Sequence, residues 1–154
     1  MSELKEGDRA PAIEALDQDG KKITLEEYRG KKVVLYFYPK DNTPGCTAES
    51  CDLRDNYKKF KEEGFEILGV SADSGKSHLK FIGKYELPFR LISDTEKIVL
   101  KDYGAWGEKK MYGKSYMGIL RKTFIIDEKG YVEKIIEKVN TKEHSKQIFA
   151  ELSH

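Results

Sequence analysis

The chain has 154 residues, with 28 Lys and Arg against 27 Asp and Glu. This length suits a single domain over residues 1–154 that buries about two-thirds of the surface its unfolded form exposes. The balanced charge, without a basic stripe, argues against a nucleic-acid partner, and the lack of a secretory signal or a membrane-length apolar run predicts a cytoplasmic protein with no membrane partner.

The predicted elements begin with a short hairpin and a buried strand. Residues 13–25 contain a turn at residues 17–20, which ends in an Asp-Gly pair typical of tight turns. Residues 33–38 form a solidly apolar run, as expected of a strand that is covered on both faces. We therefore expect an N-terminal β-hairpin followed by a central strand.

An amphipathic helix is predicted over residues 47–63. Leu53, Tyr57 and Phe60 recur at helical spacing, and Gly64 stands where a C-cap would lie. This spacing gives the helix one apolar face directed to the core.

Residues 65–72 read as a second buried strand, which completes a βαβ unit with the strand at residues 33–38 and the helix over residues 47–63. Residues 76–85 read as a helix that ends before Pro88. Residues 93–96 have the spacing of a capping box, which predicts a short helix that reaches about Tyr103.

The last third of the chain predicts a loop, a hairpin and a helix. Residues 104–118 are rich in glycine and aromatic residues, so we expect an ordered loop. Residues 123–127 and 131–137 flank a turn and predict a hairpin, and residues 141–152 close the chain as a helix. This order indicates an α/β fold with a mixed central sheet flanked by helices, for which a thioredoxin-like arrangement fits.

Cys46 is the candidate nucleophile. It follows the strand at residues 33–38 after a turn that Pro39 and Pro44 stiffen, and in open α/β sheets ligands gather beyond the carboxyl ends of strands. We expect Cys46 in the first turn of a helix, where free N–H groups and the helix dipole favour an anion. Such surroundings lower the pKa of a thiol from near 8.5 to roughly 3.5–7.5.

Thr43 and Arg121 are the candidate partners of Cys46. The hydroxyl of Thr43 either orients an oxygen-containing substrate beside the thiolate or caps the helix, and both interpretations stay open. A guanidinium over the reacting atoms would assist attack on a peroxide-like bond. Arg121 stands just before a predicted strand, although a solvated surface arginine is the ordinary interpretation; Arg54 lies about 12 Å along the helix from Cys46 and is a poorer candidate.

The chain has two cysteines, five positions apart. In a reducing compartment such a pair is more often catalytic or redox-sensing than a structural staple. On one continuous helix the Cα atoms of Cys46 and Cys51 would lie about 8–9 Å apart, beyond the roughly 7 Å limit for a disulfide. A bridge would therefore require the helix to unwind; alternatively, Cys51 is a small buried core residue. The scattered histidines give no zinc-ligand spacing, so we expect no metal.

These residues resemble the peroxiredoxins, whose P-x-x-x-T-x-x-C motif is matched by Pro39, Thr43 and Cys46. The resemblance is to the bacterioferritin comigratory protein, or peroxiredoxin Q, subfamily. It covers nearly the whole chain, through residues 46–51, 69–74, 87–89, 106–109 and 121–127. The resemblance implies a thioredoxin-like fold, a monomer, and chemistry without metal, flavin or nucleotide cofactors.

The resemblance also implies a mechanism. A hydroperoxide oxidises a peroxidatic cysteine to a sulfenic acid, a resolving cysteine in the same chain forms a disulfide with it, and thioredoxin reduces that disulfide. An alternative is a peroxide-sensing redox switch or a chaperone-like binding module, whereas a thiol–disulfide oxidoreductase is disfavoured because C-x-x-C is absent. The implied roles are peroxidatic cysteine for Cys46, resolving cysteine for Cys51, activating partners for Thr43 and Arg121, pocket shield for Pro39 and holder of the arginine for Glu49.

Overall fold

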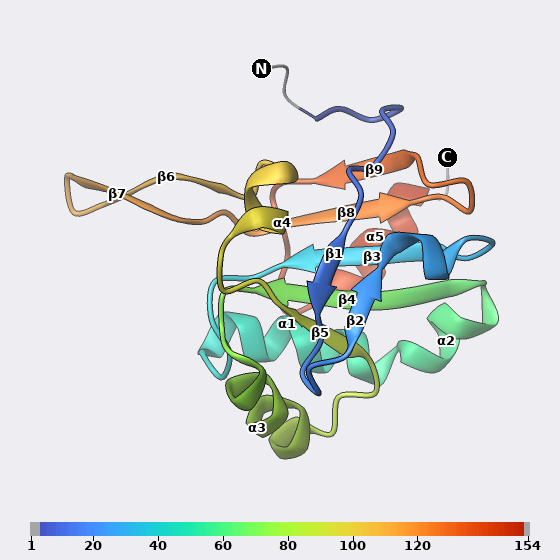
Figure 1. Ribbon diagram of the computed structural model, residues 1–154, viewed down its shortest axis with the longest axis horizontal. Helices are drawn as coiled ribbons and strands as arrows, with labels where there is room; N and C mark the ends of the chain where they lie inside the picture. Colours follow the sequence, from blue (N-terminus) through green and yellow to red (C-terminus); the bar gives the residue numbers. More distant parts are fainter. Residues whose placement is uncertain (1–3, 153–154) are drawn as a thin grey trace.

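A five-stranded mixed sheet forms the centre of the molecule (Figure 1), with the strand order β5-β4-β3-β8-β9. The computed structural model describes residues 4–152. Strands β3, β4 and β5 run parallel, while β8 pairs antiparallel with β3 and with β9. The five strands are β3 (Lys32–Phe37), β4 (Phe65–Ser71), β5 (Arg90–Ser93), β8 (Lys122–Ile126) and β9 (Val132–Ile136).

Alternate residues of β3 enter two separate cores, because successive side chains of a strand point to opposite faces of the sheet. Val33, Leu35 and Phe37 belong to one core, and Val34 and Tyr36 to the other. All five side chains are at most 1% exposed. The apolar run at residues 33–38 thus predicted a strand covered on both faces, and the structure confirms it.

Helices cover one face of the sheet, and smaller elements cover the other (Figure 1). The core around Val34 includes side chains from α1 (Pro44–Asp55), α2 (Tyr57–Glu62), α3 (Gly75–Tyr85) and α5 (His144–Leu152). The opposite core includes side chains from the 3-10 turn η1 (Leu25–Tyr28), from α4 (Ile98–Asp102) and from the segment that leads into β1. The predicted N-terminal hairpin is confirmed, with β1 (Glu14–Leu16) antiparallel to β2 (Lys22–Thr24).

The helix predicted over residues 47–63 is two helices. It begins earlier, at Pro44, because Thr43 is extended and Pro44 suits the first helical position. It breaks at Asn56, whose side-chain amide donates to the carbonyl oxygen of Asp52 at 2.9 Å and so competes with the regular helical pattern.

The predicted capping box at residues 93–96 is wrong. Ser93 is the last residue of β5, a strand that the sequence analysis did not anticipate. The carboxylate of Asp94 instead accepts a hydrogen bond from the backbone N–H of Leu100 at 2.7 Å. Lys97, with a φ of 63°, then turns the chain into α4.

The loop predicted over residues 104–118 is also wrong. Strands β6 (Trp106–Met111) and β7 (Lys114–Ile119) form an antiparallel hairpin that extends away from the central sheet (Figure 1). Tyr112 and Gly113 between them both have positive φ, as two-residue hairpin turns of type I′ require. Since most side chains of β7 are exposed, the hairpin has no apolar alternation to reveal it.

The remaining predictions hold to within a few residues. Strands β8 and β9 form the expected antiparallel hairpin, and α5 begins at His144 rather than at residue 141. The side-chain oxygen of Asn140 accepts the backbone N–H groups of Lys142 and Glu143 at 3.2 Å, which delays the helix start.

Within residues 4–152, no helix combines the length and the apolarity needed to cross a bilayer. The expected α/β fold with a mixed sheet flanked by helices is confirmed.

Candidate active site

Cys46 is the third residue of α1 and lies beyond the carboxyl end of β3. The predicted position of Cys46 in the first turn of a helix is therefore confirmed. The backbone N–H of Thr47 donates to the carbonyl oxygen of Thr43 at 2.8 Å, which starts the helix around the cysteine. Cys46 is only 1% exposed, so its sulfur lies at the edge of the core rather than on the open surface.

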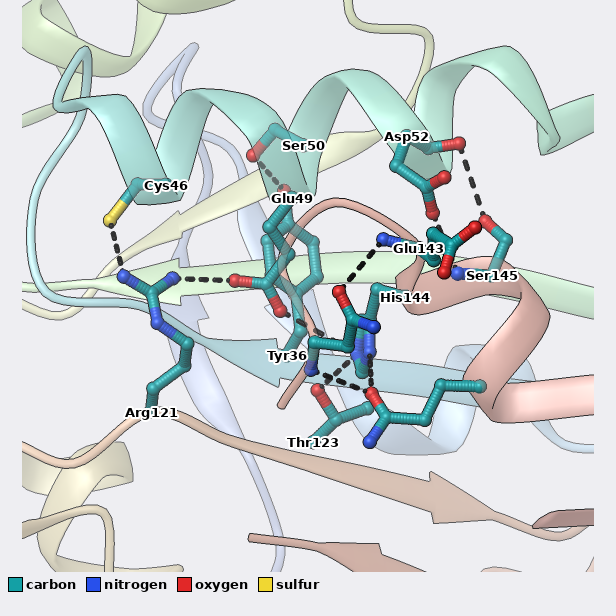
Figure 2. Close-up of polar contacts among 12 residues, drawn as sticks. Tyr36, Cys46, Glu49, Ser50, Asp52, Arg121, Thr123, Glu143, His144 and Ser145 are labelled. Atoms are coloured by element: carbon teal, nitrogen blue, oxygen red, sulfur yellow. Dashed lines mark hydrogen bonds and ion pairs between the residues drawn. The ribbon is translucent and has the colours of Figure 1, made fainter. Parts of the chain in front are cut away.

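Arg121 lies between the sulfur of Cys46 and the carboxyl group of Glu49 (Figure 2). Its Nη2 is 3.3 Å from Cys46 Sγ, and its Nη1 donates to Glu49 Oε1 at 2.7 Å. Burial lowers the pKa of Arg121, but the neighbouring Glu49 and Cys46 outweigh burial and raise it overall. The structure thus brings a permanent positive charge to the sulfur from a segment 75 positions away in sequence.

Gly45 provides the space that the guanidinium occupies. A Cβ atom added to Gly45 would stand 3.2 Å from Nη2 of Arg121, closer than nine in ten real Cβ contacts. The guanidinium would therefore have to shift by a few tenths of an ångström to admit a larger residue before Cys46.

Glu49 follows Cys46 by one helical turn, and its side chain is fully buried. Burial raises the pKa of Glu49 to about 7, although Arg121 acts to lower it; Asp52 adds to the rise. Its Oε1 binds Arg121, whereas Oε2 has no hydrogen-bond partner among the described residues. Nε2 of His144 lies 3.5 Å from Glu49 Oε2.

His144, the first residue of α5, joins the site from behind Glu49 (Figure 2). Its Nε2 lies 2.7 Å from the hydroxyl oxygen of Thr123, and its Nδ1 lies 2.9 Å from Gln147 Oε1. Burial lowers the pKa of His144 to about 4, so the ring is neutral near pH 7. The sequence analysis did not identify this residue; its spacing of four from the buried Ile148 was the available signal that it faces the core.

The helix that carries His144 is fixed to the helix that carries Cys46. The carboxylate of Asp52 on α1 accepts the backbone N–H of Ser145 at 2.6 Å, and the Ser145 hydroxyl donates to the Asp52 carbonyl oxygen at 3.3 Å. The N-terminus of α5 thereby keeps its place against α1.

Cys51 is on the same helix as Cys46, and both carry free thiols. Cys51 is partly exposed rather than a fully buried core residue. Burial raises its pKa, and the neighbouring Arg54 acts in the opposite direction. Arg54 itself donates to the carbonyl oxygen of Tyr85 at 2.8 Å and pairs with Asp55. It therefore connects α1 to the end of α3, and neither of these contacts involves Cys46.

Thr43 and Pro39 both lie in the connection between β3 and α1. The Thr43 hydroxyl donates to the carbonyl oxygen of Lys40 at 2.8 Å. Although Thr43 occupies the N-cap position, its side chain accepts no capping hydrogen bond within the described part of the chain. Pro39 is partly buried directly after β3.

A thioredoxin-like sheet with a buried thiol at a helix N-terminus, under an arginine, defines a thiol-dependent oxidoreductase site. Residues 6–135 match the AhpC/TSA family model. The chain therefore belongs to the AhpC/TSA family and, within it, to the peroxiredoxins of the bacterioferritin comigratory protein or peroxiredoxin Q type. Its activity class is that of a peroxidase.

Individual relatives span almost the full length of the chain. Peroxiredoxin Bcp of Bacillus subtilis is 47% identical over 138 residues, which are 90% of this chain and 88% of the relative. Peroxiredoxin Bcp of Escherichia coli is 42% identical over 144 residues, covering 94% and 92%. A mutant of Xylella fastidiosa PrxQ superposes with a TM-score of 0.91 at 32% identity, covering 99% and 97%; a Xanthomonas campestris peroxiredoxin Q mutant gives 0.85 at 38%, covering 91% and 89%.

Proposed function

We propose that this protein reduces hydrogen peroxide and organic hydroperoxides through Cys46. The observation that carries the proposal is the 3.3 Å contact between Arg121 Nη2 and Cys46 Sγ, because a guanidinium there stabilises a thiolate. The thiolate attacks one peroxide oxygen, so that an S–O bond forms while the O–O bond breaks. Cys46 becomes a sulfenic acid, and the leaving oxygen takes a proton from solvent to give water or an alcohol.

Arg121 serves the reacting atoms as well as the thiolate. As the O–O bond breaks, negative charge grows on the leaving oxygen, and a fixed guanidinium can donate to it from a second N–H group. Thr43 and Pro39 both precede Cys46, in the connection between β3 and α1. We assign Thr43 to the orientation of the peroxide and Pro39 to the exclusion of water from the sulfur, as the family resemblance implies.

Cys51 is the proposed resolving cysteine. Because both thiols lie on α1, the first turn must unwind before their sulfurs can meet. That turn contains Gly45 and has a side chain at its N-cap that makes no capping bond in the described chain, and both features weaken a helix start by about 1 kcal/mol each. The Cys51 thiolate then attacks the oxidised sulfur, an S–S bond forms, and the oxygen leaves as water.

An external dithiol protein of the thioredoxin class supplies the two electrons that reduce this disulfide by thiol–disulfide exchange. We further predict from the sequence that the protein acts in the cytoplasm and that it is a monomer. Oxidation of each chain once, with no recycling by thioredoxin, would instead favour the peroxide-sensing switch.

The test combines stopped-flow peroxide consumption with mass spectrometry of the sulfur species. The Cys46→Ser variant should lose peroxide consumption entirely. The Cys51→Ser variant, which serves as its matched control, should keep the first oxidation and accumulate sulfenic acid on Cys46. Full turnover by Cys46→Ser would contradict the proposal.

A further inference from the structure

The orientation of Gln147 is fixed by the backbone. Its Oε1 accepts the backbone N–H of Asn140 at 2.9 Å, and its Nε2 donates to the carbonyl oxygen of Lys138 at 2.7 Å. Exchanging the amide oxygen and nitrogen would place a donor against a donor and an acceptor against an acceptor. Gln147 therefore presents an oxygen, which can only accept, to the ring of His144.

This orientation fixes the tautomer of His144. Since Nδ1 lies 2.9 Å from Gln147 Oε1, Nδ1 carries the hydrogen. In a neutral ring Nε2 then has a lone pair, and the Thr123 hydroxyl donates to it at 2.7 Å. The ring thus has no N–H to offer Glu49.

Glu49 Oε2 faces that lone pair at 3.5 Å and has no hydrogen-bond donor among the described residues (Figure 2). A buried carboxylate oxygen in this position would be repelled by the ring nitrogen and left without solvation. A proton on Oε2 removes this repulsion and makes Glu49 a second, more distant donor to the lone pair that already accepts the Thr123 hydroxyl. The rise of the Glu49 pKa to about 7, which burial causes, agrees with this arrangement.

We propose that Glu49 holds a proton on Oε2 and shares it with His144 Nε2, so that His144 is a positioning residue that leaves the charge of Arg121 to the Cys46 thiolate. The catalytic meaning of this inference rests on the function proposed above. A neutral Glu49 still accepts from Arg121 through Oε1, but it does not neutralise the guanidinium. Sulfur and arginine then form the balanced charge pair of the site.

The other groups near this pair come from three elements. From α1, Asp52 acts on both Glu49 and His144 and raises the pKa of each, and Cys46 lies beyond the guanidinium. Arg121, the residue before β8, acts to lower both values. From β3, the hydroxyl of Tyr36 is hydrogen-bonded to Ser50 at 2.8 Å, and burial raises its pKa well above the usual value, so it stays neutral.

Loss of the shared proton should slow the peroxide step. When Glu49 ionises, a second anion competes with the thiolate for Arg121, and the reactive form of Cys46 becomes less stable. The rate constant for oxidation of Cys46 should therefore fall by about five- to tenfold, giving a falling limb in the pH profile, as the pH rises through the range in which Glu49 loses its proton.

Two substitutions of His144 should move the falling limb to lower pH by different amounts. In His144→Phe, the Glu49 proton loses its acceptor and the ionised oxygen loses the opposing lone pair, so burial alone holds the proton and the limb should shift to slightly lower pH. In His144→Gln, an amide can donate to Oε2 and stabilise the ionised oxygen, so the limb should shift further to lower pH. If both variants keep the wild-type limb, the inference is overturned.

Glu49→Gln provides a third arm, because a residue without a titrating proton should lose the falling limb altogether. Glu143→Gln is its matched control, since Glu143 is an exposed carboxylate beside His144 whose side chain takes no part in the site. This control should keep the wild-type profile. Retention of the falling limb in Glu49→Gln would also overturn the inference.

A measurement without peroxide separates this inference from the proposed function. Carbon-13 NMR of labelled glutamate carboxyl groups should show one group, absent in Glu49→Gln, that titrates near pH 7. Nitrogen-15 NMR should show the His144 ring protonated at Nδ1 and responding at Nε2 to the same titration. A Glu49 carboxylate that stays ionised from pH 5 to 9 would overturn the inference even in an active peroxidase, whereas this titration in a protein that does not reduce peroxide would refute only the function.

Discussion

Two buried histidines, His78 and His144, each lie against a buried carboxyl group, yet their hydrogen bonds differ. His78 on α3 places Nδ1 at 2.7 Å from Asp41 Oδ2 and Nε2 at 3.0 Å from the carbonyl oxygen of Ile92. Both ring nitrogens therefore face acceptor oxygens, and Nδ1 lies within ion-pair distance of Asp41. Behind Arg121, by contrast, His144 has one donor and one acceptor nitrogen.

The two carboxyl groups differ in the same way. Asp41 Oδ1 accepts the Tyr38 hydroxyl at 2.6 Å, and Oδ2 accepts the Ser77 hydroxyl at 2.8 Å as well as His78. Glu49 has one oxygen without any donor in the described chain. A fully paired cluster holds structure, here the connection before Cys46 against α3, whereas an incompletely paired one can change its protonation beside the reacting sulfur.

The Asp41 cluster also has the spacing of a metal site. Ligand atoms of Asp41, Asp73 and His78 lie within 4.8 Å of one another. Hydrogen bonds already use these atoms, since Asp73 Oδ2 accepts the backbone N–H of Asp41 at 2.8 Å and the Ser71 hydroxyl at 2.7 Å. The cluster is therefore explained as a hydrogen-bonded joint.

The largest expected effect is on folding, at the fully paired cluster. Asp41→Asn removes the charge that compensates the buried His78 ring and puts an amide among three donors. Breaking a buried pair in this way costs about 3–5 kcal/mol, measured as the free energy of unfolding in urea. Asp102→Asn, at an exposed position, should change that free energy by less than about 0.5 kcal/mol. An Asp41→Asn protein as stable as the wild type would show that the cluster is not an ion pair.

The fold was predictable where apolar runs or helical spacing were long. Strand β3 has five consecutive buried residues and was placed within one residue of its bounds. Strand β5 has four residues, of which only Leu91 and Ile92 are fully buried, and such a run is too short to distinguish from a loop. The break at Asn56 depends on one side-chain hydrogen bond that periodicity does not report.

The site was predictable only in part. The turn before Cys46 is local, so the sequence located the nucleophile from chain order alone. The approach of Arg121 was implied by the family resemblance, since spacing left a surface arginine as the ordinary interpretation. The contact between Glu49, Thr123 and His144 joins two helices and a strand, and no local pattern encodes it.

The next largest effect is on the rate at which peroxide oxidises Cys46, beside the Glu49–His144 pair. Arg121→Ala removes the donor beside Cys46 Sγ and should slow oxidation of Cys46 by about 10²–10³, the usual effect of removing a donor that meets developing charge. Stopped-flow measurement with excess hydrogen peroxide gives this rate constant. Arg54→Ala is the matched control and should leave the rate unchanged. An unaltered rate in Arg121→Ala would show that another group activates the sulfur.

The third prediction uses the dependence of stability on pH. The pKa of Glu49 is raised by burial from 4.5 to about 7 on folding, so between these values the folded state binds more protons than the unfolded state. The resulting stabilisation is complete below pH 4.5 and is lost as the pH rises through about 7. Relative to Glu49→Gln, the wild-type free energy of unfolding should therefore fall by up to about 3 kcal/mol across this window. Urea titrations at several pH values measure this difference; a constant difference would contradict the assigned protonation of Glu49.

The smallest effects compare one hydroxyl in each cluster. Ser77→Ala removes one donor from Asp41 Oδ2, which keeps His78, and Thr123→Val removes the hydroxyl that donates to His144 Nε2. Each should cost about 1 kcal/mol in the free energy of unfolding. Only Thr123→Val should alter the rate profile, because the freed lone pair of Nε2 then binds the Glu49 proton alone and holds it to a higher pH. A shift of the falling limb in Ser77→Ala, or none in Thr123→Val, would erase the distinction between a joint that only holds structure and a pair that responds to pH.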